Sequence, residues 1–226
     1  MIFLDHVYKS YPRNIEVLKN VDLFIKAGEF VSLVGQSGSG KTTIVKTLIG
    51  EEKIDNGRVV IGDWDITKIS KREVPYLRRQ IGVIFQDFKL LPKKTLRENV
   101  AFALEVCGQN QSKIDRIVTA VLRIVGLEDK ANQYPNEVSG GEQQRAAIAR
   151  ALVHQPKILL ADEPTGNLDS INANEIIELL LRINNFGTTV ILVTHNREIV
   201  NRLKKRVITI DSGIIVSDQE KGKYVI

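Results

Sequence analysis

The sequence lacks the residues that would cross-link it or anchor it in a membrane. Its one cysteine, Cys107, rules out a disulfide within the chain, so we expect a reducing compartment. No uncharged apolar run approaches the roughly 18 residues that a membrane-spanning helix needs. The amino terminus has no basic region and reaches Asp5 too early for a signal peptide. We therefore expect any action at a membrane to depend on a partner.

Charge is only slightly unbalanced. The 226 residues, 43% of them hydrophobic, fit one globular domain, and 32 Lys and Arg against 27 Asp and Glu give a net charge of +5. The excess is sharpest in residues 68–97, where nine basic residues face only Glu73 and Asp87. A solvated helix face, a surface near anionic lipid and a surface near nucleic acid all remain open.

Strand-like and helix-like segments alternate along most of the chain. Strands are expected at residues 2–8, 21–25, 30–34, 58–61, 81–85, 158–161, 189–193 and 207–210. Helices are expected at residues 42–49, 170–185 and 196–203, and over nearly all of 95–155. Ser/Thr-x-x-Glu capping boxes are expected at Ser70, Thr95 and Ser139. This alternation predicts an α/β fold with a mostly parallel sheet and an inserted helical subdomain.

A phosphate-binding loop follows the strand at residues 30–34 and opens a helix. It matches the pattern G-x-x-x-x-G-K-[ST] and consists of Gly35, Gln36, Ser37, Gly38, Ser39, Gly40, Lys41 and Thr42, followed by Thr43. Glycines let backbone N–H groups surround a phosphate, and the helix start adds its positive dipole end. Lys41 is predicted to place its charge on the β- and γ-phosphates, and the Thr42 hydroxyl to bind Mg²⁺.

Two adjacent acids end the apolar run at residues 158–161. Buried carboxylates are costly unless a cation or a reaction uses them. Asp162 is therefore predicted to hold Mg²⁺, and Glu163 to polarise an attacking water. Together with the loop, the pair predicts hydrolysis of a nucleoside triphosphate.

A second anion site is predicted at Ser139, Gly140, Gly141 and Glu142. Ser139 is expected to cap a helix beginning near Gly141, with Glu142 closing the capping box. A chain with one phosphate loop and one spare anion-binding helix start suggests that two copies complete each other's sites.

These motifs, in this order, resemble the ABC transporter ATPases over essentially the whole chain. The resemblance implies a single ABC domain, with a nucleotide-binding core at 1–86 and 156–226, an N-terminal antiparallel β region and a helical subdomain at about 87–155. It implies that ATP and Mg²⁺ are bound and that Tyr11 stacks on adenine. Gln86 would join the Mg²⁺ and water network, Asp169 would belong to the D-loop, and His195 would reach the γ-phosphate.

The signature motif departs mildly from the family pattern. Val138 stands where Leu is usual, and Glu142 stands where Gln is usual. The glutamate keeps the capping role but adds negative charge near the nucleotide, which leaves its contact with a second copy open.

The run from Glu163 to Asp169, with residues 142–145, is similar to a branch of the family that contains lipoprotein-release, macrolide-efflux and cell-division ATPases. Within that branch, residues 74–106 are most similar to the cell-division ATPases, FtsE. That resemblance implies a head-to-tail dimer on the cytoplasmic face of the membrane at the division site. It further implies an integral membrane partner of the FtsX type, activation of cell-wall hydrolases, and contacts with other division proteins. An ATPase of a lipoprotein-release or macrolide-efflux transporter is the alternative. A soluble ABC ATPase acting on nucleic acid or the ribosome is more distant, and no nucleic-acid partner is expected.

The composition of one loop indicates contact with a partner. Phe88, Leu90 and Leu91 precede Pro92, with Lys89, Lys93 and Lys94 around them. The apolar residues are predicted either to form a socket for a partner's cytoplasmic helix or, for Phe88, to be buried within the helical subdomain.

Overall fold

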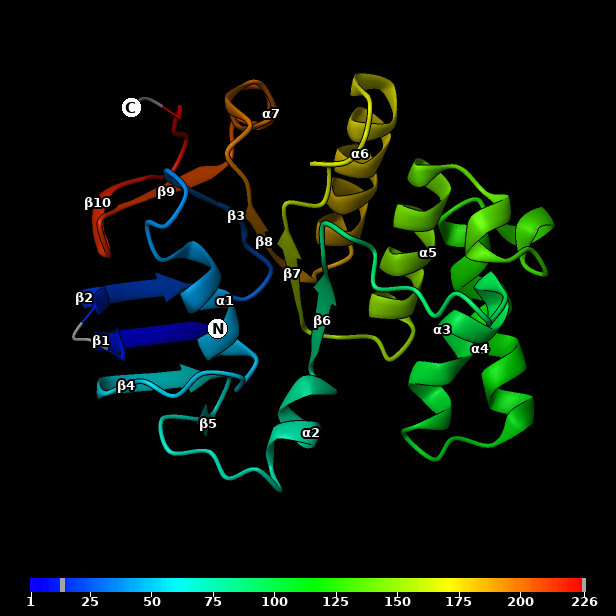
Figure 1. Ribbon diagram of the computed structural model, residues 1–226, viewed down its shortest axis with the longest axis horizontal. Coiled ribbons are helices and arrows are strands. Elements are labelled where there is room, and N and C mark those ends of the chain that lie inside the picture. The colour runs from blue at the N-terminus through cyan, green and yellow to red at the C-terminus, as the bar shows by residue number, and fades with distance from the viewer. Residues whose placement is uncertain (13–14, 225–226) are drawn as a thin grey trace.

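The computed structural model describes residues 1–12 and 15–224, which form two sheets and a group of helices (Figure 1). The first sheet is antiparallel, with the order β2-β1-β4-β5. Its strands are β1 (Ile2–Tyr11), β2 (Ile15–Ile25), β4 (Asn56–Ile61) and β5 (Trp64–Asp65). This sheet is the predicted antiparallel region at the amino terminus.

The second sheet has six strands in the order β10-β9-β3-β8-β7-β6. They are β3 (Phe30–Val34), β6 (Ile81–Ile84), β7 (Ile158–Asp162), β8 (Thr189–Val193), β9 (Arg206–Asp211) and β10 (Ile214–Gln219). All neighbours pair in parallel except β10, which runs antiparallel to β9. The carboxyl ends of the parallel strands therefore meet at one edge, where ligands bind in open α/β sheets.

Seven α-helices lie within the described part of the chain. They are α1 (Lys41–Leu48), α2 (Val74–Arg78), α3 (Leu96–Glu105), α4 (Gln111–Ile124), α5 (Gly140–Leu152), α6 (Ser170–Asn185) and α7 (Arg197–Leu203). Figure 1 shows α3, α4 and α5 gathered beyond β6, away from the antiparallel sheet. None of the helices in residues 1–12 and 15–224 combines the length and apolar character needed to cross a bilayer.

Each face of the parallel sheet has its own core. Along β7, Leu159 and Ala161 pack with α3–α6, whereas Ile158 and Leu160 pack with α1 and the antiparallel sheet. Side chains of a strand alternate between its faces, so covering both faces requires the unbroken apolar runs seen in the sequence.

The predicted fold class is confirmed, and the differences are local. Neither β5 nor β10 was predicted; β10 is an edge strand with mostly exposed residues, and its apolar start, residues 214–216, does not alternate with polar residues. The segment between α4 and α5 holds two short 3₁₀ helices, Glu128–Lys130 and Pro135–Glu137. The boxes at Thr95 and Ser139 cap α3 and α5 as predicted, whereas Ser70 and Glu73 form a turn before α2.

Candidate active site for nucleotide hydrolysis

The phosphate loop connects β3 to α1, in the strand-loop-helix order that its sequence predicts. Gly40 is the N-cap of α1 with φ 110°, a backbone conformation suited to glycine, and a Cβ there would lie 2.9 Å from the Val17 carbonyl oxygen. Gly38, with φ 78°, has open space where its side chain would stand. The loop is thus packed against β2 on one side and open on the other.

The Lys41 ammonium lies inside the loop. Its Nζ donates to the carbonyl oxygens of Gly35 at 2.8 Å and Gln36 at 2.7 Å, and the residue is buried. Burial lowers the pKa of Lys41, whereas the nearby carboxylates of Glu163 and Asp162 raise it. The lysine charge and both acids therefore lie near one another at one edge of the sheet.

Asp162 ends β7, and Glu163 turns the chain immediately after it. Burial, followed by the Glu163 carboxylate, raises the pKa of Asp162, and Lys41 lowers it. Glu163 has φ 48°, a strained conformation for a residue with a side chain. Its N–H donates to the Val193 carbonyl at 2.9 Å, which ties this turn to the end of β8.

Three groups hold the Glu163 carboxylate. The Thr194 hydroxyl donates to Oε2 at 3.1 Å, the His195 N–H donates to Oε1 at 3.0 Å, and His195 Nδ1 lies 2.7 Å from Oε1. The imidazole itself stays largely exposed, so its other nitrogen faces solvent. A carboxylate oriented by a histidine and a hydroxyl is suited to hold a water and accept its proton.

The Gln86 side chain is exposed next to β6 and bonds to the segment that follows Glu163. Gln86 Nε2 donates to Asn167 Oδ1 at 3.2 Å, and Asn167 Nδ2 donates to the Gln86 carbonyl at 3.0 Å. Sequence reasoning missed Asn167, because the two partners lie 81 positions apart and leave no local pattern.

The signature helix start, residues Ser139–Glu142, carries its own carboxylate. Ser139 Oγ accepts from the Glu142 N–H at 3.3 Å and donates to Glu142 Oε2 at 2.9 Å. Lys130 Nζ lies 2.5 Å from Glu142 Oε1, and this hydrogen bond, with those from Ser139, holds the pKa of Glu142 at about 2. Lys130, which the sequence reasoning missed, therefore balances the negative charge that Glu142 adds.

Gly141 lies against the start of α6. A Cβ on Gly141 would stand 2.1 Å from Asn172 Oδ1, and Asn172 Nδ2 donates to Asp169 Oδ2 at 2.5 Å. Asp169 Oδ1 in turn accepts the N–H groups of Ile171 and Asn172, both at 2.9 Å, and so caps α6. These bonds lower the pKa of Asp169. Asp169 and the signature helix start thus share one small, tightly filled contact.

The predicted residues form two separate groups. Among the hydrogen bonds and ion pairs of the described residues, none joins the signature helix start to Lys41, Asp162 or Glu163. Tyr11 ends β1, and its ring centroid lies 5.4 Å from Lys9 Nζ, so its adenine contact stays a prediction. Arg150 of α5 was missed: its guanidinium donates to the carbonyls of Phe88 (2.8 Å) and Lys89.

Comparison with known proteins supplies the family. The ABC transporter family model matches residues 18–166. The cell division ATP-binding protein FtsE of Bacillus subtilis is 52% identical over 99% of this chain and 98% of its own length. FtsE of Escherichia coli is 44% identical over 94% of this chain and 96% of its own length.

A solved structure agrees with this assignment. The dimeric post-hydrolysis state of an ATP-binding cassette, bound to ADP and Pi, aligns with a TM-score of 0.89 and 37% identity. It covers 99% of this chain and 100% of that one. The chain belongs to the ABC transporter family and is an ATPase of that family.

Proposed function

We propose that this chain is the ATP-binding subunit of a cell-division ABC complex of the FtsE type, working as a head-to-tail dimer beneath an integral membrane partner of the FtsX type. The full-length identity of 44–52% to FtsE proteins carries this proposal. The output we propose is motion, driven by ATP, that activates cell-wall hydrolases across the membrane at the division site. The same identity favours this role over lipoprotein release or macrolide efflux.

The catalytic roles follow from the two groups of residues. Tyr11 stacks the adenine, and the loop from Gly35 to Thr43 binds the phosphates with the Lys41 charge. Glu163 orients a water and accepts its proton, while His195 holds that carboxylate and stabilises charge on the departing phosphoryl group. Positioning and electrostatics supply most of the rate, as in phosphoryl transfer generally.

The donors near Asp162 fit a magnesium ion. Mg²⁺ prefers oxygen ligands, and the half-buried Asp162 carboxylate and the exposed Thr42 hydroxyl can provide them. We assign Thr42, Asp162 and the Gln86 amide oxygen to this ion. When bound, Mg²⁺ neutralises charge on the phosphate oxygens.

In the proposed dimer, the second copy supplies its signature helix start to the nucleotide site of the first. Ser139, Gly140 and Gly141 start a helix whose N-terminus carries partial positive charge. Among the described residues, no hydrogen bond or ion pair joins this helix start to Lys41, Asp162 or Glu163. In the proposed dimer this helix start binds the γ-phosphate held by the other copy, with Asp169 and Glu142 positioning it from the same side. The chain is also proposed to comprise a core at 1–86 and 156–226 and an inserted helical subdomain at about 87–155.

The proposed contact with the membrane partner involves fewer residues of the loop than its sequence suggested. Leu90 packs against the helical core and Phe88 is half-buried, with its Cζ 3.8 Å from where a Cβ on Gly140 would stand. Leu91 is 37% exposed, and Lys89 and Lys93 are exposed beside it. We propose that Leu91 and these lysines meet the membrane partner while Phe88 connects that contact to the signature helix start.

The test is a hydrolysis-deficient protein used as bait. Glu163→Gln removes the proton acceptor but keeps the side-chain shape, so hydrolysis should fall by roughly a thousandfold while ATP binding persists. The variant should accumulate as an ATP-bound dimer in light scattering and retain a membrane protein in pull-downs from membranes. Mass spectrometry then identifies the partner, and a lipoprotein-release or efflux permease in its place would contradict the division role. Hydrolysis at the wild-type rate would remove Glu163 from its assigned role.

A further inference from the structure

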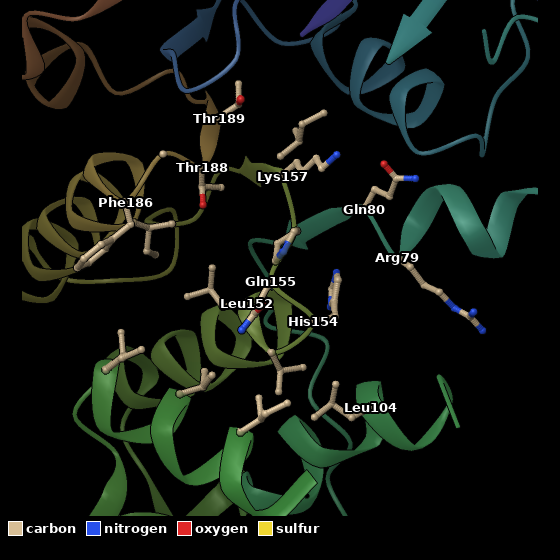
Figure 2. A pocket seen from close by; sticks show the side chains of 18 of the residues that line it. Arg79, Gln80, Leu104, Leu152, His154, Gln155, Lys157, Phe186, Thr188 and Thr189 are labelled. Atoms are coloured by element: carbon tan, nitrogen blue, oxygen red, sulfur yellow. The ribbon is translucent and has the colours of Figure 1, made fainter. Parts of the chain in front are cut away.

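A large hollow lies at the opposite edge of the parallel sheet from the nucleotide site. Its volume is about 1820 Å³, and it opens between α4, the loop from α5 to β7, and the turn from α6 to β8. Ile158 and Thr189, which begin β7 and β8, line it. Figure 2 shows Phe186 and Arg79 on opposite sides of the hollow, with Lys157 between them. None of its lining residues belongs to the catalytic groups described above.

The hollow is strongly cationic. Six basic residues line it, and Asp63 is the only acid among the lining residues. The basic residues are Arg79, Lys113, Arg116, Arg123, Lys157 and Arg182. Of these, Arg123 pairs with Glu128 at 2.6 Å, and Arg79 lies over the Tyr76 ring at 5.2 Å.

The other four have no carboxylate partner among the residues the structure describes. Lys113, Arg116, Lys157 and Arg182 are exposed, and no ion pair involves them in residues 1–12 and 15–224. Unpaired like charges around one concavity repel each other and raise the local potential, which an anionic occupant relieves.

The walls of the hollow are apolar. Ile117, Val121, Leu179 and Ile183 line it from α4 and α6. Two large side chains stand exposed there, Ile124 at 55% and Phe186 at 90%. An occupant must therefore bring apolar side chains as well as negative charge.

The size and shape of the hollow distinguish between the classes of ligand that it could bind. Small-molecule sites span roughly 300–1,000 Å³, so this hollow exceeds what one nucleotide or metabolite fills. A bilayer surface is too flat to reach into a concavity, and a nucleic-acid backbone offers no side chains to cover Ile124 and Phe186. A folded peptide segment meets both demands.

We propose that this hollow is a docking site for an acidic, amphipathic segment of a partner protein. Its carboxylates meet the four unpaired cations, and its aliphatic or aromatic residues cover Phe186, Ile124 and the apolar wall. The site is independent of the proposed division role, because it rests on the chemistry of the hollow alone.

Charge reversal with a matched control tests the proposal. The probe is a fluorescently labelled helical peptide with Glu on one face and Leu and Phe on the other, titrated against the full-length protein. Arg116→Glu with Lys157→Glu should weaken its binding about tenfold, and Lys53→Glu with Lys221→Glu, at exposed positions outside the hollow, less than about twofold. ATP hydrolysis and the melting temperature should stay unchanged in both pairs.

Two further binding experiments measure the contribution of charge and the contribution of apolar contact separately. A peptide with Gln in place of every Glu should bind about tenfold more weakly, and Phe186→Ala should weaken the acidic peptide several-fold. Because Phe186 is 90% exposed, its replacement leaves the core intact.

Several outcomes would overturn the proposal. These are no binding of the acidic peptide, equal loss in the control pair, or equal binding of the Gln peptide. Oligothymidylate and phosphatidylglycerol vesicles are tested in the same way. If either bound more tightly than the peptide, and lost binding with Arg116→Glu and Lys157→Glu, the hollow would be assigned to a nucleic acid or a lipid surface instead.

Discussion

Helices α1 and α5 both begin beside glycines, yet their first turns differ. At α1 no side chain caps the helix, and the Lys41 ammonium inside the loop bonds to loop carbonyls. At α5 the Ser139 hydroxyl caps the helix, and Glu142 completes the box while paired with Lys130. The first site supplies the Lys41 charge to an anion. The second supplies only the positive end of its helix dipole, because Lys130 neutralises the negative charge of Glu142.

This difference separates what one chain does alone from what two do together. The loop before α1 packs against the chain's own sheet and is joined electrostatically to Asp162 and Glu163. The signature helix start forms an ion pair with Lys130 and packs against Asn172, Leu168 and Phe88, with Ser139 exposed. Substitutions at the first site should therefore weaken ATP binding by a single copy, and those at the second should spare ATP binding but impair hydrolysis.

Replacing Lys41 should have the largest effect. Lys41→Met keeps the buried stem but removes the only cation that the loop supplies to the phosphates. We expect ATP affinity to fall roughly a hundredfold, since charge-assisted hydrogen bonds contribute about 1.5–3 kcal/mol each, and hydrolysis to become undetectable. Equilibrium binding of a fluorescent ATP analogue to the monomeric protein measures this directly. Unchanged affinity would mean that the backbone alone binds the phosphates.

Gly141→Ala should leave the ATP affinity of the monomer almost unchanged and lower the rate of hydrolysis about tenfold to a hundredfold. The added Cβ would meet the Asn172 amide at 2.1 Å and displace it from Asp169. Both the helix start and the α6 cap then shift in the surface proposed to meet the second copy. Single-turnover hydrolysis and dimer formation with ATP are the measurements.

Two variants make that test specific. Gly140→Ala is the matched control for the fold, because its Cβ would meet Leu168 and Phe88 only at ordinary contact distances of 3.5 and 3.8 Å. Adding Asn172→Ala to Gly141→Ala should recover any lost melting temperature by making room. If Gly141→Ala also weakened ATP binding by the monomer, the two helix starts would not be separable.

The contrast between the helix starts also shows how far the sequence could predict the site. The loop from Gly35 to Thr42 could be assigned because its chemistry is local: strand, glycines and lysine follow one another within a few residues. Ser139 and Glu142 could be assigned for the same reason, as a capping box spans three residues. The parallel sheet followed from the alternation of strands and helices, whereas the edge strand β10 lacked the alternation of apolar and polar residues that marks a half-buried strand.

What the sequence could not predict depends on residues brought together by folding. Lys130 reaches Glu142 from a 3₁₀ turn, and Asn167 meets Gln86 from 81 residues away. The cationic hollow gathers single basic residues from α2 to α6, none of them adjacent in the sequence. In residues 68–97 the basic residues have different surroundings: Lys89 pairs with Asp87, Arg97 pairs with Asp115, and Arg79 lines the hollow.

The smallest expected effect concerns Lys130, as a positioning residue for the signature helix start. Lys130→Met leaves the Glu142 carboxylate without its cation, beside the place proposed for a γ-phosphate. We expect hydrolysis to fall only about threefold, because the lysine is partly exposed and solvent screens the charge. Glu142→Gln in the same chain should restore the rate by removing the uncompensated charge, which a merely structural role of Lys130 would not predict.

The acid behaviour of Glu142 sharpens the same test. Its pKa of about 2 lies below the ordinary 4.5, so the ionised form stabilises the folded state above pH 4.5, and that contribution is lost as the pH falls towards 2. Lys130→Met should raise this pKa, so the loss should begin at higher pH, measured by ¹³C NMR of the carboxyl group and by acid unfolding. Arg58→Met is the matched control, because Arg58 pairs at 2.7 Å with Asp65, whose pKa is also about 2 and which belongs to neither the phosphate loop nor the signature helix start. It should shift the Asp65 titration yet leave hydrolysis unchanged; equal loss of hydrolysis in both variants would show that charge pairing at α5 has no special role.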